Sequence, residues 1–271
     1  MKRSWFATPY AVWSILFTVV PLLLVCKYAF TDSAGAFALA NFERFFRPTI
    51  LGVLKQSLWM ALLCTVICLI VAYPAALFLT SRDFSKHQAL VVLVILPMWM
   101  NFLLRTYAWL TLLEDTGLIN QLLESMGLPR LSLLYNDGAV LMGMVYNFLP
   151  FMVLPIYTVL TKMDKRIIEA AEDLGANWFH VLTRVIFPLS LPGVLSGITM
   201  VFMPSVSTFV IPKLLGGGSN MLFGDLIEQQ FITTGNWNFG SALSLLMMVL
   251  ILISMGLLNR VDPKREGGAI W

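Results

Sequence analysis

The sequence predicts an all-α, polytopic membrane protein with six transmembrane helices, and three observations lead to this prediction. Hydrophobic residues make up 58% of the 271 residues and charged residues only 12%, whereas soluble domains carry roughly 25% charged residues. Apolar runs long enough to cross a bilayer recur along the chain. The polar segments between these runs are too short to form a separate soluble domain. Residues 1–271 are therefore expected to form a single transmembrane domain.

Each expected span is a largely apolar run bounded by polar residues. The first run lacks a convincing small-residue cleavage site, so it is interpreted as a retained span rather than a signal peptide. The expected spans are residues 9–30, 58–80, 89–113, 139–161, 186–212 and 241–258. On the side opposite the N-terminus, residues 114–138 and 213–240 are expected to be loops. Residues 31–56 are polar and mixed, and residues 41–46 could lie along the membrane interface.

The distribution of Lys and Arg predicts the orientation. With both termini in the cytoplasm, more of these residues fall on the cytoplasmic side than on the outer side, as the positive-inside rule requires. The basic residues are spread between the spans, so no nucleic-acid partner is expected, and the partner of the apolar surface is membrane lipid. Cys26, Cys64 and Cys68 lie in apolar runs and are interpreted as small buried residues. Two soft ligands on one helical face do not make a zinc site, so no metal or other cofactor is expected.

The longest cytoplasmic interruption, residues 162–188, is polar but has a helical pattern. Its apolar residues recur at steps of three and four, which predicts one apolar helical face; they are Ile167, Ala171, Leu174, Trp178 and Val181. Gly175 lies in the middle and weakens a continuous helix by about 1 kcal/mol relative to Ala. Two short helices meeting near Gly175 are therefore expected, with Pro188 ending this element and starting the next span.

Such a segment, held between two spans, is a candidate docking surface for a partner protein. The alternative is an amphipathic helix that lies on the lipid surface. Surface helices of that kind usually carry Lys and Arg on their polar face. Here residues 169–173 are acidic, which disfavours contact with an anionic membrane and favours docking.

The spacing within this segment resembles that of a known family. Glu169-Ala170-Ala171, three further residues, Gly175, twelve further residues and Pro188 resemble the EAA loop of permease subunits of bacterial ABC importers. The family places Ile and Leu three residues and one residue before the proline, where this chain has Val185 and Phe187. The resemblance implies that the ATPase-coupling residues are Glu169, Ala170, Ala171, Asp173, Leu174, Gly175 and Pro188.

The sequence lacks the motifs and residues that an ATPase or an intramembrane enzyme would need. It has no GxxxxGK[ST] motif, the usual cradle for ATP phosphates. If transport is driven by ATP, the ATPase is expected on another polypeptide. Both histidines, His87 and His180, lie in cytoplasmic segments, and no Asp or Glu lies inside an expected span. An intramembrane enzyme would need a general base or a bound metal at that depth.

Arg105 is the one ionisable residue clearly within an expected span. By default such a residue faces a polar pathway or a partner. The alternative is a structural arginine that pairs with Glu114, Asp115 or backbone carbonyls. Asn147 could likewise serve only as an interhelical hydrogen bond. The candidate translocation-pathway residues are Asn101, Arg105, Tyr107, Trp109, Tyr146, Asn147 and Thr208.

Four acids lie in the outer segments. They could attract a cation or meet a substrate-delivery protein, although loop acids are most often only solvated. These candidate outer-face acids are Glu114, Asp115, Asp225 and Glu228.

Further blocks resemble the B-type permeases of spermidine/putrescine importers. They include Leu96-Pro97-Met98-Trp99, Tyr146-Asn147-Phe148-Leu149-Pro150 and Asn236-Trp237-Asn238-Phe239-Gly240. The resemblance implies a bacterial inner-membrane permease that imports a small organic cation with a second permease subunit, two ATPase copies and an extracytoplasmic binding protein. Related permeases for iron or sulfate share part of the blocks. An ion-coupled secondary transporter would usually show an intramembrane acid or interrupted helices in matching halves. A non-transporting scaffold would not need polar residues at membrane depth.

Overall fold

The computed structural model describes residues 8–32, 34–80, 88–218 and 221–261. Within these ranges the chain is helical, and Thr31 and Phe37 form an isolated antiparallel β-bridge. In chain order the elements are α1 (Thr8–Ser14), the π-helical turn η2 (Ile15–Val19), α2 (Val20–Ala29), α3 (Ala40–Phe45), α4 (Pro48–Thr80), α5 (Gln88–Trp99), α6 (Phe102–Leu113), α7 (Leu118–Ser125), α8 (Asp137–Thr161), α9 (Lys165–Asp173), α10 (Trp178–Val181), the π-helical turn η3 (Leu182–Ile186), α11 (Phe187–Ser207), α12 (Val210–Leu215), α13 (Phe223–Ile232) and α14 (Trp237–Val261).

The number of spans agrees with the sequence prediction, although one span is bent. Five continuous helical segments among the described residues are long and apolar enough to cross a membrane: Pro9–Ala29, Pro48–Thr80, Asp137–Thr161, Trp178–Ser207 and Trp237–Leu257. A sixth passes the same test only as a pair, Val91–Trp99 and Phe102–Ser125, bent by 97° at the break. The prediction of an all-α protein with six spans is therefore confirmed if this bent pair is counted as one span.

The core is the packing of α4, α8 and α11 against one another, and small residues bring their backbones close. At Gly193 an added Cβ would lie 2.9 Å from the Pro155 carbonyl oxygen and 3.2 Å from the Ile156 Cα. At Gly197 it would lie 2.6 Å from the Met152 sulfur. Lipid tails are as apolar as these side chains, so close van der Waals packing, rather than the hydrophobic effect, holds such helices together.

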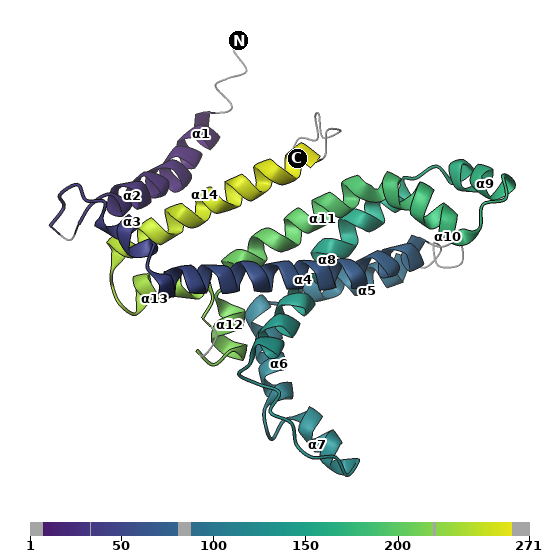
Figure 1. Ribbon diagram of the computed structural model, residues 1–271, viewed down its shortest axis with the longest axis horizontal. Helices are drawn as coiled ribbons and strands as arrows, with labels where there is room; N and C mark the ends of the chain where they lie inside the picture. Colours follow the sequence, from purple (N-terminus) through teal and green to yellow (C-terminus); the bar gives the residue numbers. More distant parts are fainter. Residues whose placement is uncertain (1–7, 33, 81–87, 219–220, 262–271) are drawn as a thin grey trace.

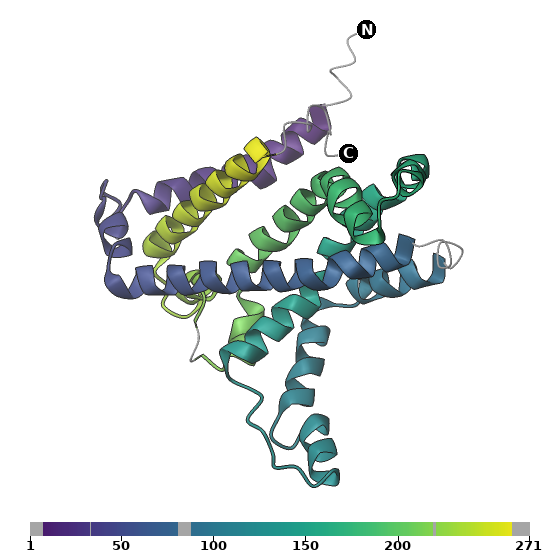
Figure 2. The ribbon, with the colours of Figure 1, turned by 45° about the vertical axis from the view of Figure 1, so that its right-hand side comes forward.

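A second layer is formed by α14 and the helix of α1 and α2. Figures 1 and 2 show α14 beside α2 and separate from α11 toward its C-terminal end. The Asn238 side-chain amide links the start of α14 to the segment just after α2. Its Nδ2 donates to the Thr31 carbonyl at 2.8 Å. The helix α13 joins this layer to the core, where the Phe223 backbone N–H donates to Ser57 Oγ at 2.6 Å.

Several expected boundaries were wrong. The second span begins at Pro48 rather than residue 58, since proline is well tolerated in the first helical turn. The expected straight span 89–113 breaks after Trp99, where Asn101 Oδ1 accepts the Leu103 backbone N–H at 2.8 Å and caps a new helix. The expected loops 114–138 and 213–240 contain the short helices α7 and α13, and residues 41–46, which could lie along the interface, belong largely to the short helix α3.

The fifth span was expected to reach residue 212, and this was also wrong. It ends at Ser207, because Thr208 is extended with a ψ of 140°. The short helix α12 then departs in a new direction and packs against α6 and α8. The basic residues at both termini and in residues 81–87, which entered the orientation argument, lie outside the described residues.

The two ends of the bundle differ. Figure 1 shows α9 and α10 at one end of α4, α8 and α11, whereas α3 and α13 lie at the opposite end. The helix α6 and the following α7 extend sideways from the bundle. The segment that resembles the EAA loop is therefore carried at one extremity of the helical core.

Substituting Gly193 by Ala is expected to destabilise the protein by about 1–3 kcal/mol, because the new methyl group would meet the Pro155 backbone. The matched control is Gly52→Ala, since no atom lies within 4 Å of an added Cβ there and Ala favours a helix interior over Gly. The measurement is the thermal unfolding midpoint of each purified variant in detergent. Equal midpoints for the two variants would contradict the close α8–α11 packing.

Candidate functional site

Residues 164–181 form a helix–turn–helix unit with a capping group at each helix start. The Asp164 carboxylate accepts the Arg166 backbone N–H at 3.0 Å and begins α9. The Asn177 side-chain oxygen accepts the His180 N–H at 2.9 Å and begins α10. Between them Gly175 has a φ of +83°, and its N–H donates to the Glu172 carbonyl at 2.9 Å. The expectation of two short helices meeting near Gly175 is confirmed.

The backbone conformation at position 175 favours glycine, whereas the room around it would admit a larger side chain. No atom lies within 4 Å of a Cβ added there. However, a φ of +83° lies in the left-handed region, which costs an ordinary L-residue roughly 1–2 kcal/mol. The turn therefore sets the angle between α9 and α10.

The unit exposes large apolar side chains at its tip. Leu174 is 89% exposed, Trp178 66% and Phe179 64%. A cavity of about 420 Å³ opens beside them and is lined by Ala171, Leu174, Gly175, Ala176, Asn177, His180, Arg184 and Val185. Exposed apolar patches rimmed by polar groups mark interaction sites. We call the surface formed by Leu174, Trp178 and Phe179 the α9–α10 tip. The described residues leave it exposed.

Two local expectations about this segment were wrong. Val181 does not share an exposed face with Leu174 and Trp178, because the chain turns at Gly175 and buries Val181 to 1% exposure. Pro188 does not end the segment either. The helix runs through it from Trp178 to Ser207, and the π-helical turn η3 immediately before it lets the Phe187 N–H reach the Leu182 carbonyl.

The remaining residues of the EAA-like pattern lie on the first helix of the unit. Glu169, Ala170 and Asp173 are exposed on α9, whereas Ala171 is half-buried. These pattern residues lie close together because they are neighbours on one short helix.

A second candidate region lies where the third span breaks. Arg105 on α6 is only 6% exposed, and its Nε and Nη1 atoms are buried without a hydrogen-bond partner. It forms no ion pair with Glu114, Asp115 or any other described acid, so the pairing considered from the sequence is not present. Buried unpaired polar groups are rare and usually have a functional cause or an unseen partner such as water.

The other candidate pathway residues surround the junction of α6, α8 and α12. Trp109 packs edge-on against Tyr146, with ring centroids 5.3 Å apart. Asn147 is 1% exposed; its Nδ2 donates to the Gly143 carbonyl at 2.9 Å, while its Oδ1 has no partner. Thr208 is buried at the break after α11, whereas Tyr107 is half-exposed. The buried polar atoms without a partner on Arg105 and Asn147 thus belong to two helices, α6 and α8, that contact each other.

The four acids that were expected at the outer face form two different groups. Glu114 and Asp115 line a cavity of about 330 Å³ together with Thr116, Ser132, Leu134 and Tyr135. Asp225 and Glu228 lie instead on α13, where Glu228 pairs with Lys213 of α12 at 2.7 Å. Burial raises the pKa of the Asp225 carboxyl above its ordinary value; the nearby Glu228 charge raises it further, and Lys213 opposes the shift.

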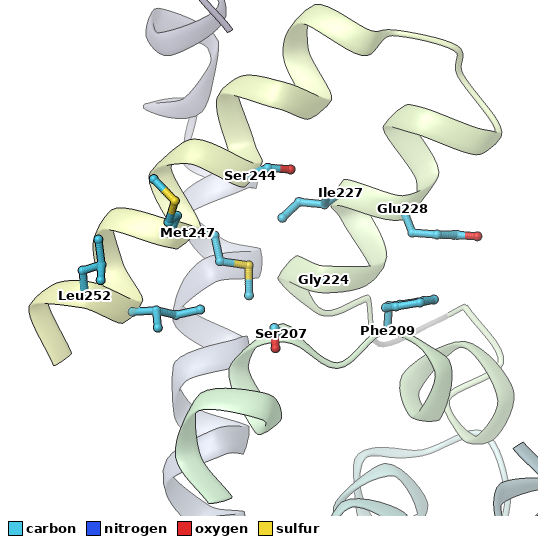
Figure 3. A pocket seen from close by; sticks show the side chains of 10 residues that line it. Ser207, Phe209, Gly224, Ile227, Glu228, Ser244, Met247 and Leu252 are labelled. Carbon is cyan, nitrogen blue, oxygen red and sulfur yellow. The ribbon is translucent and has the colours of Figure 1, made fainter. Parts of the chain in front are cut away.

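An apolar cavity of about 480 Å³ lies between the end of α11, α13 and α14. Figure 3 shows Ser244, Met247 and Leu252 of α14 across from Ile227 of α13, with Ser207 below. The Ser207 and Ser244 hydroxyls donate to carbonyls of their own helices, so each uses its one hydrogen within its helix. The cavity reflects the separation of α14 from the core.

Sequence reasoning missed two features near α12. Tyr135 has a φ of 62°, rare for a bulky residue, and its ring touches Gly217, where an added Cβ would lie 2.4 Å away. The Lys213–Glu228 ion pair links two elements that were expected to be one loop. The glycines at 216–218 were the only signal of a close approach. No group of three or more metal-ligating side chains occurs among the described residues.

Five continuous spans and one bent span, with an uncovered helix–turn–helix unit between the fourth and fifth, define a multi-pass membrane component of the permease class. The family model for the inner-membrane component of binding-protein-dependent transport systems matches residues 72–267. The chain belongs to this family.

Curated relatives agree with this assignment, and a solved structure shares the fold. The spermidine/putrescine transport system permease protein PotB of Haemophilus influenzae is 38% identical over 250 residues, which cover 89% of this chain and 87% of the relative. The Escherichia coli K12 protein of the same name is 35% identical over 88% of this chain and 90% of its own length. A crystal structure of a bacterial alginate ABC transporter with its periplasmic protein superposes on 95% of this chain and 92% of that chain, with a TM-score of 0.82 and 15% identity.

Replacing Arg105 by Met is expected to leave the free energy of unfolding unchanged or to raise it by about 1–3 kcal/mol, because it removes an unpaired buried cation. The contrasting variant is Lys213→Met, which deprives the largely buried Glu228 of its partner and is expected to lower stability. Thermal unfolding midpoints in detergent test both. A clear loss of stability in Arg105→Met would mean that Arg105 has a partner within the folded chain.

Proposed function

We propose that this chain is one permease subunit of an ATP-driven importer for polyamines such as spermidine or putrescine. It forms half of the translocation pathway with a second permease subunit. Two copies of a separate ATPase and an extracytoplasmic binding protein complete the complex. ATP binds to the ATPase, so this subunit needs no cofactor of its own.

The observation that carries the coupling role is the uncovered α9–α10 tip. Leu174, Trp178 and Phe179 are apolar and exposed at the extremity of the molecule, where membrane burial is disfavoured by the acids of α9. A helix that lays apolar side chains into a groove of a partner is a common recognition mode. The fixed Gly175 turn would transmit movements of the ATPase to α8 and α11, the spans that flank the unit.

The substrate class rests on the relatives. Two relatives named as spermidine/putrescine permeases are 35–38% identical over most of both chains. Carboxylates of the described spans lie at or beyond the ends of α6 and α8, as Glu114, Asp115, Glu124 and Asp137, and not in the middle of a span. Recognition of a polyamine is therefore assigned mainly to the binding protein. Permeation of iron or sulfate by the same mechanism is the alternative. An ion-coupled secondary transporter is disfavoured because it would usually need an acid at mid-membrane depth, and the middle parts of the described spans carry none.

The orientation and the pathway are part of this proposal. With α9 and α10 in the cytoplasm, both termini lie there too, and the outer acids Glu114, Asp115, Asp225 and Glu228 face the binding protein. In this orientation, the helix breaks at Asn101 and Thr208 lie between the cytoplasmic side and the outer side of the protein. Arg105, Tyr107, Trp109, Tyr146 and Asn147 follow or face these breaks, and we assign them to the pathway.

Two substitutions in the helix–turn–helix unit are expected to abolish ATP-dependent uptake while membrane insertion stays intact. Glu169→Lys reverses a charge on α9, and Gly175→Pro both removes the N–H that bonds Glu172 and fixes φ near −65°. Gly175→Asn is the matched control, because Asn tolerates the left-handed conformation, and it should retain most uptake. Normal uptake by the first two variants would disprove the coupling assignment.

The substrate is tested by uptake of labelled spermidine into proteoliposomes that contain the complete transporter and its binding protein. ATP-dependent accumulation that unlabelled putrescine competes with, and that ferric iron and sulfate do not affect, is the expected result. Accumulation of iron or sulfate in place of spermidine would keep the mechanism and overturn the substrate.

A further inference from the structure

Two interrupted spans meet at the junction of α6, α8 and α12. The third span bends by 97° after Trp99, and α6 starts there at Phe102. The fifth span ends at Ser207, and the α12 that follows it packs against α6 and α8 (Figure 1). Irregular backbone at membrane depth is tolerated where it is buried in protein or lines a water-filled space. This junction therefore suits a polar passage between the two sides of the membrane.

Arg105 brings an uncompensated positive charge to this junction. The residue is 6% exposed, and its Nε and Nη1 atoms are buried without a hydrogen-bond partner. It has no ion pair with a described acid, and the middle parts of the described spans carry no Asp or Glu. A charge that is removed from water is screened less than a solvated one, so its field extends further.

The start of α6 adds to this field. Arg105 completes the first turn of α6, and the N-terminal end of a helix carries about half a positive elementary charge, which disfavours a cation. The Asn147 side chain on the contacting helix α8 has an oxygen without a partner but no charge to offset that of Arg105. The placement of Arg105 is thus unfavourable for the folded chain by itself, and such local conflicts are expected at functional sites.

We propose that Arg105 and the start of α6 form an electrostatic barrier that keeps cations from leaking through the pathway in the absence of ATP. Arginines and the positive ends of half-helices exclude cations from membrane pores in this way. The inference rests on the proposed function for the position of the pathway, and it gives Arg105 the role of excluding cations rather than binding substrate. Import of a polycation then requires a movement of α6 that withdraws Arg105 from the pathway.

The test is the passive efflux of labelled spermidine from proteoliposomes that contain the complete transporter without ATP. Arg105→Met removes the charge and is expected to speed efflux about ten-fold, which corresponds to about 1.4 kcal/mol in the barrier. Arg105→Gln, which keeps a polar group without the charge, should give the same result. Arg105→Lys keeps the charge and should stay within a few-fold of wild type.

Two controls separate the charge from a loss of packing. Thr106→Val alters the neighbouring buried side chain, whose hydroxyl donates to the Phe102 carbonyl at 3.0 Å, and should leave spermidine efflux unchanged. Efflux of labelled sucrose, an uncharged solute, should remain slow in Arg105→Met and Arg105→Gln.

Wild-type rates of spermidine efflux in Arg105→Met and Arg105→Gln would overturn the inference, and an acid of the second permease subunit that neutralises Arg105 would give this result. An equal rise in sucrose efflux would also overturn it, because the substitution would then have opened a hole in the packing. ATP-dependent import by the wild type, measured in the same proteoliposomes, tests the proposed function separately. Its absence would overturn the proposed substrate, whereas the efflux rates of the Arg105 variants would still decide the barrier.

Discussion

The close packing of α8 on α11 is the constraint on which the rest of the structure depends. These two helices flank the α9–α10 unit, and Gly193 and Gly197 let α11 approach the α8 backbone at Pro155 and Met152. In a membrane this contact must come from shape, since lipid competes equally well for apolar surface. Because the two helices are fixed against each other, the chain between them starts and ends at fixed points. A short unit with a rigid turn can then project from the bundle with little support of its own.

The rigid α9–α10 unit can transmit a displacement to the span that follows it. The turn at Gly175 is set by backbone conformation, and both helices carry capping side chains, so the angle between α9 and α10 is defined locally. The π-helical turn η3 lets α10 continue into α11 without interruption at Pro188. A partner that binds the α9–α10 tip therefore contacts the start of a continuous helix of 30 residues, Trp178–Ser207. A displacement of its first turn is carried to the break after Ser207.

The sequence predicted those parts of the molecule that depend on local pattern. Span number and the bend at Gly175 follow from hydrophobic periodicity and one glycine. It failed where distant segments decide the geometry. The break at Asn101 depends on a cap that the apolar run concealed, and the end of α11 at Ser207 depends on how α12 and α13 pack. Arg105 was recognised as unusual from its position, but its lack of a partner was visible only after α6 had been placed. The Lys213–Glu228 pair could not be foreseen because both residues were assigned to one loop.

The central claim is that the α9–α10 tip binds the ATPase. The most direct measurement is thiol labelling of a Leu174→Cys variant with a membrane-permeant maleimide in inverted membrane vesicles, after Cys26, Cys64 and Cys68 are replaced by Ala. The account predicts rapid labelling when the ATPase has been stripped from the vesicles and strong protection when it is restored, with Leu128→Cys, an exposed residue after α7 at another extremity, giving no such change. Equal labelling of Leu174→Cys with and without the ATPase would contradict it.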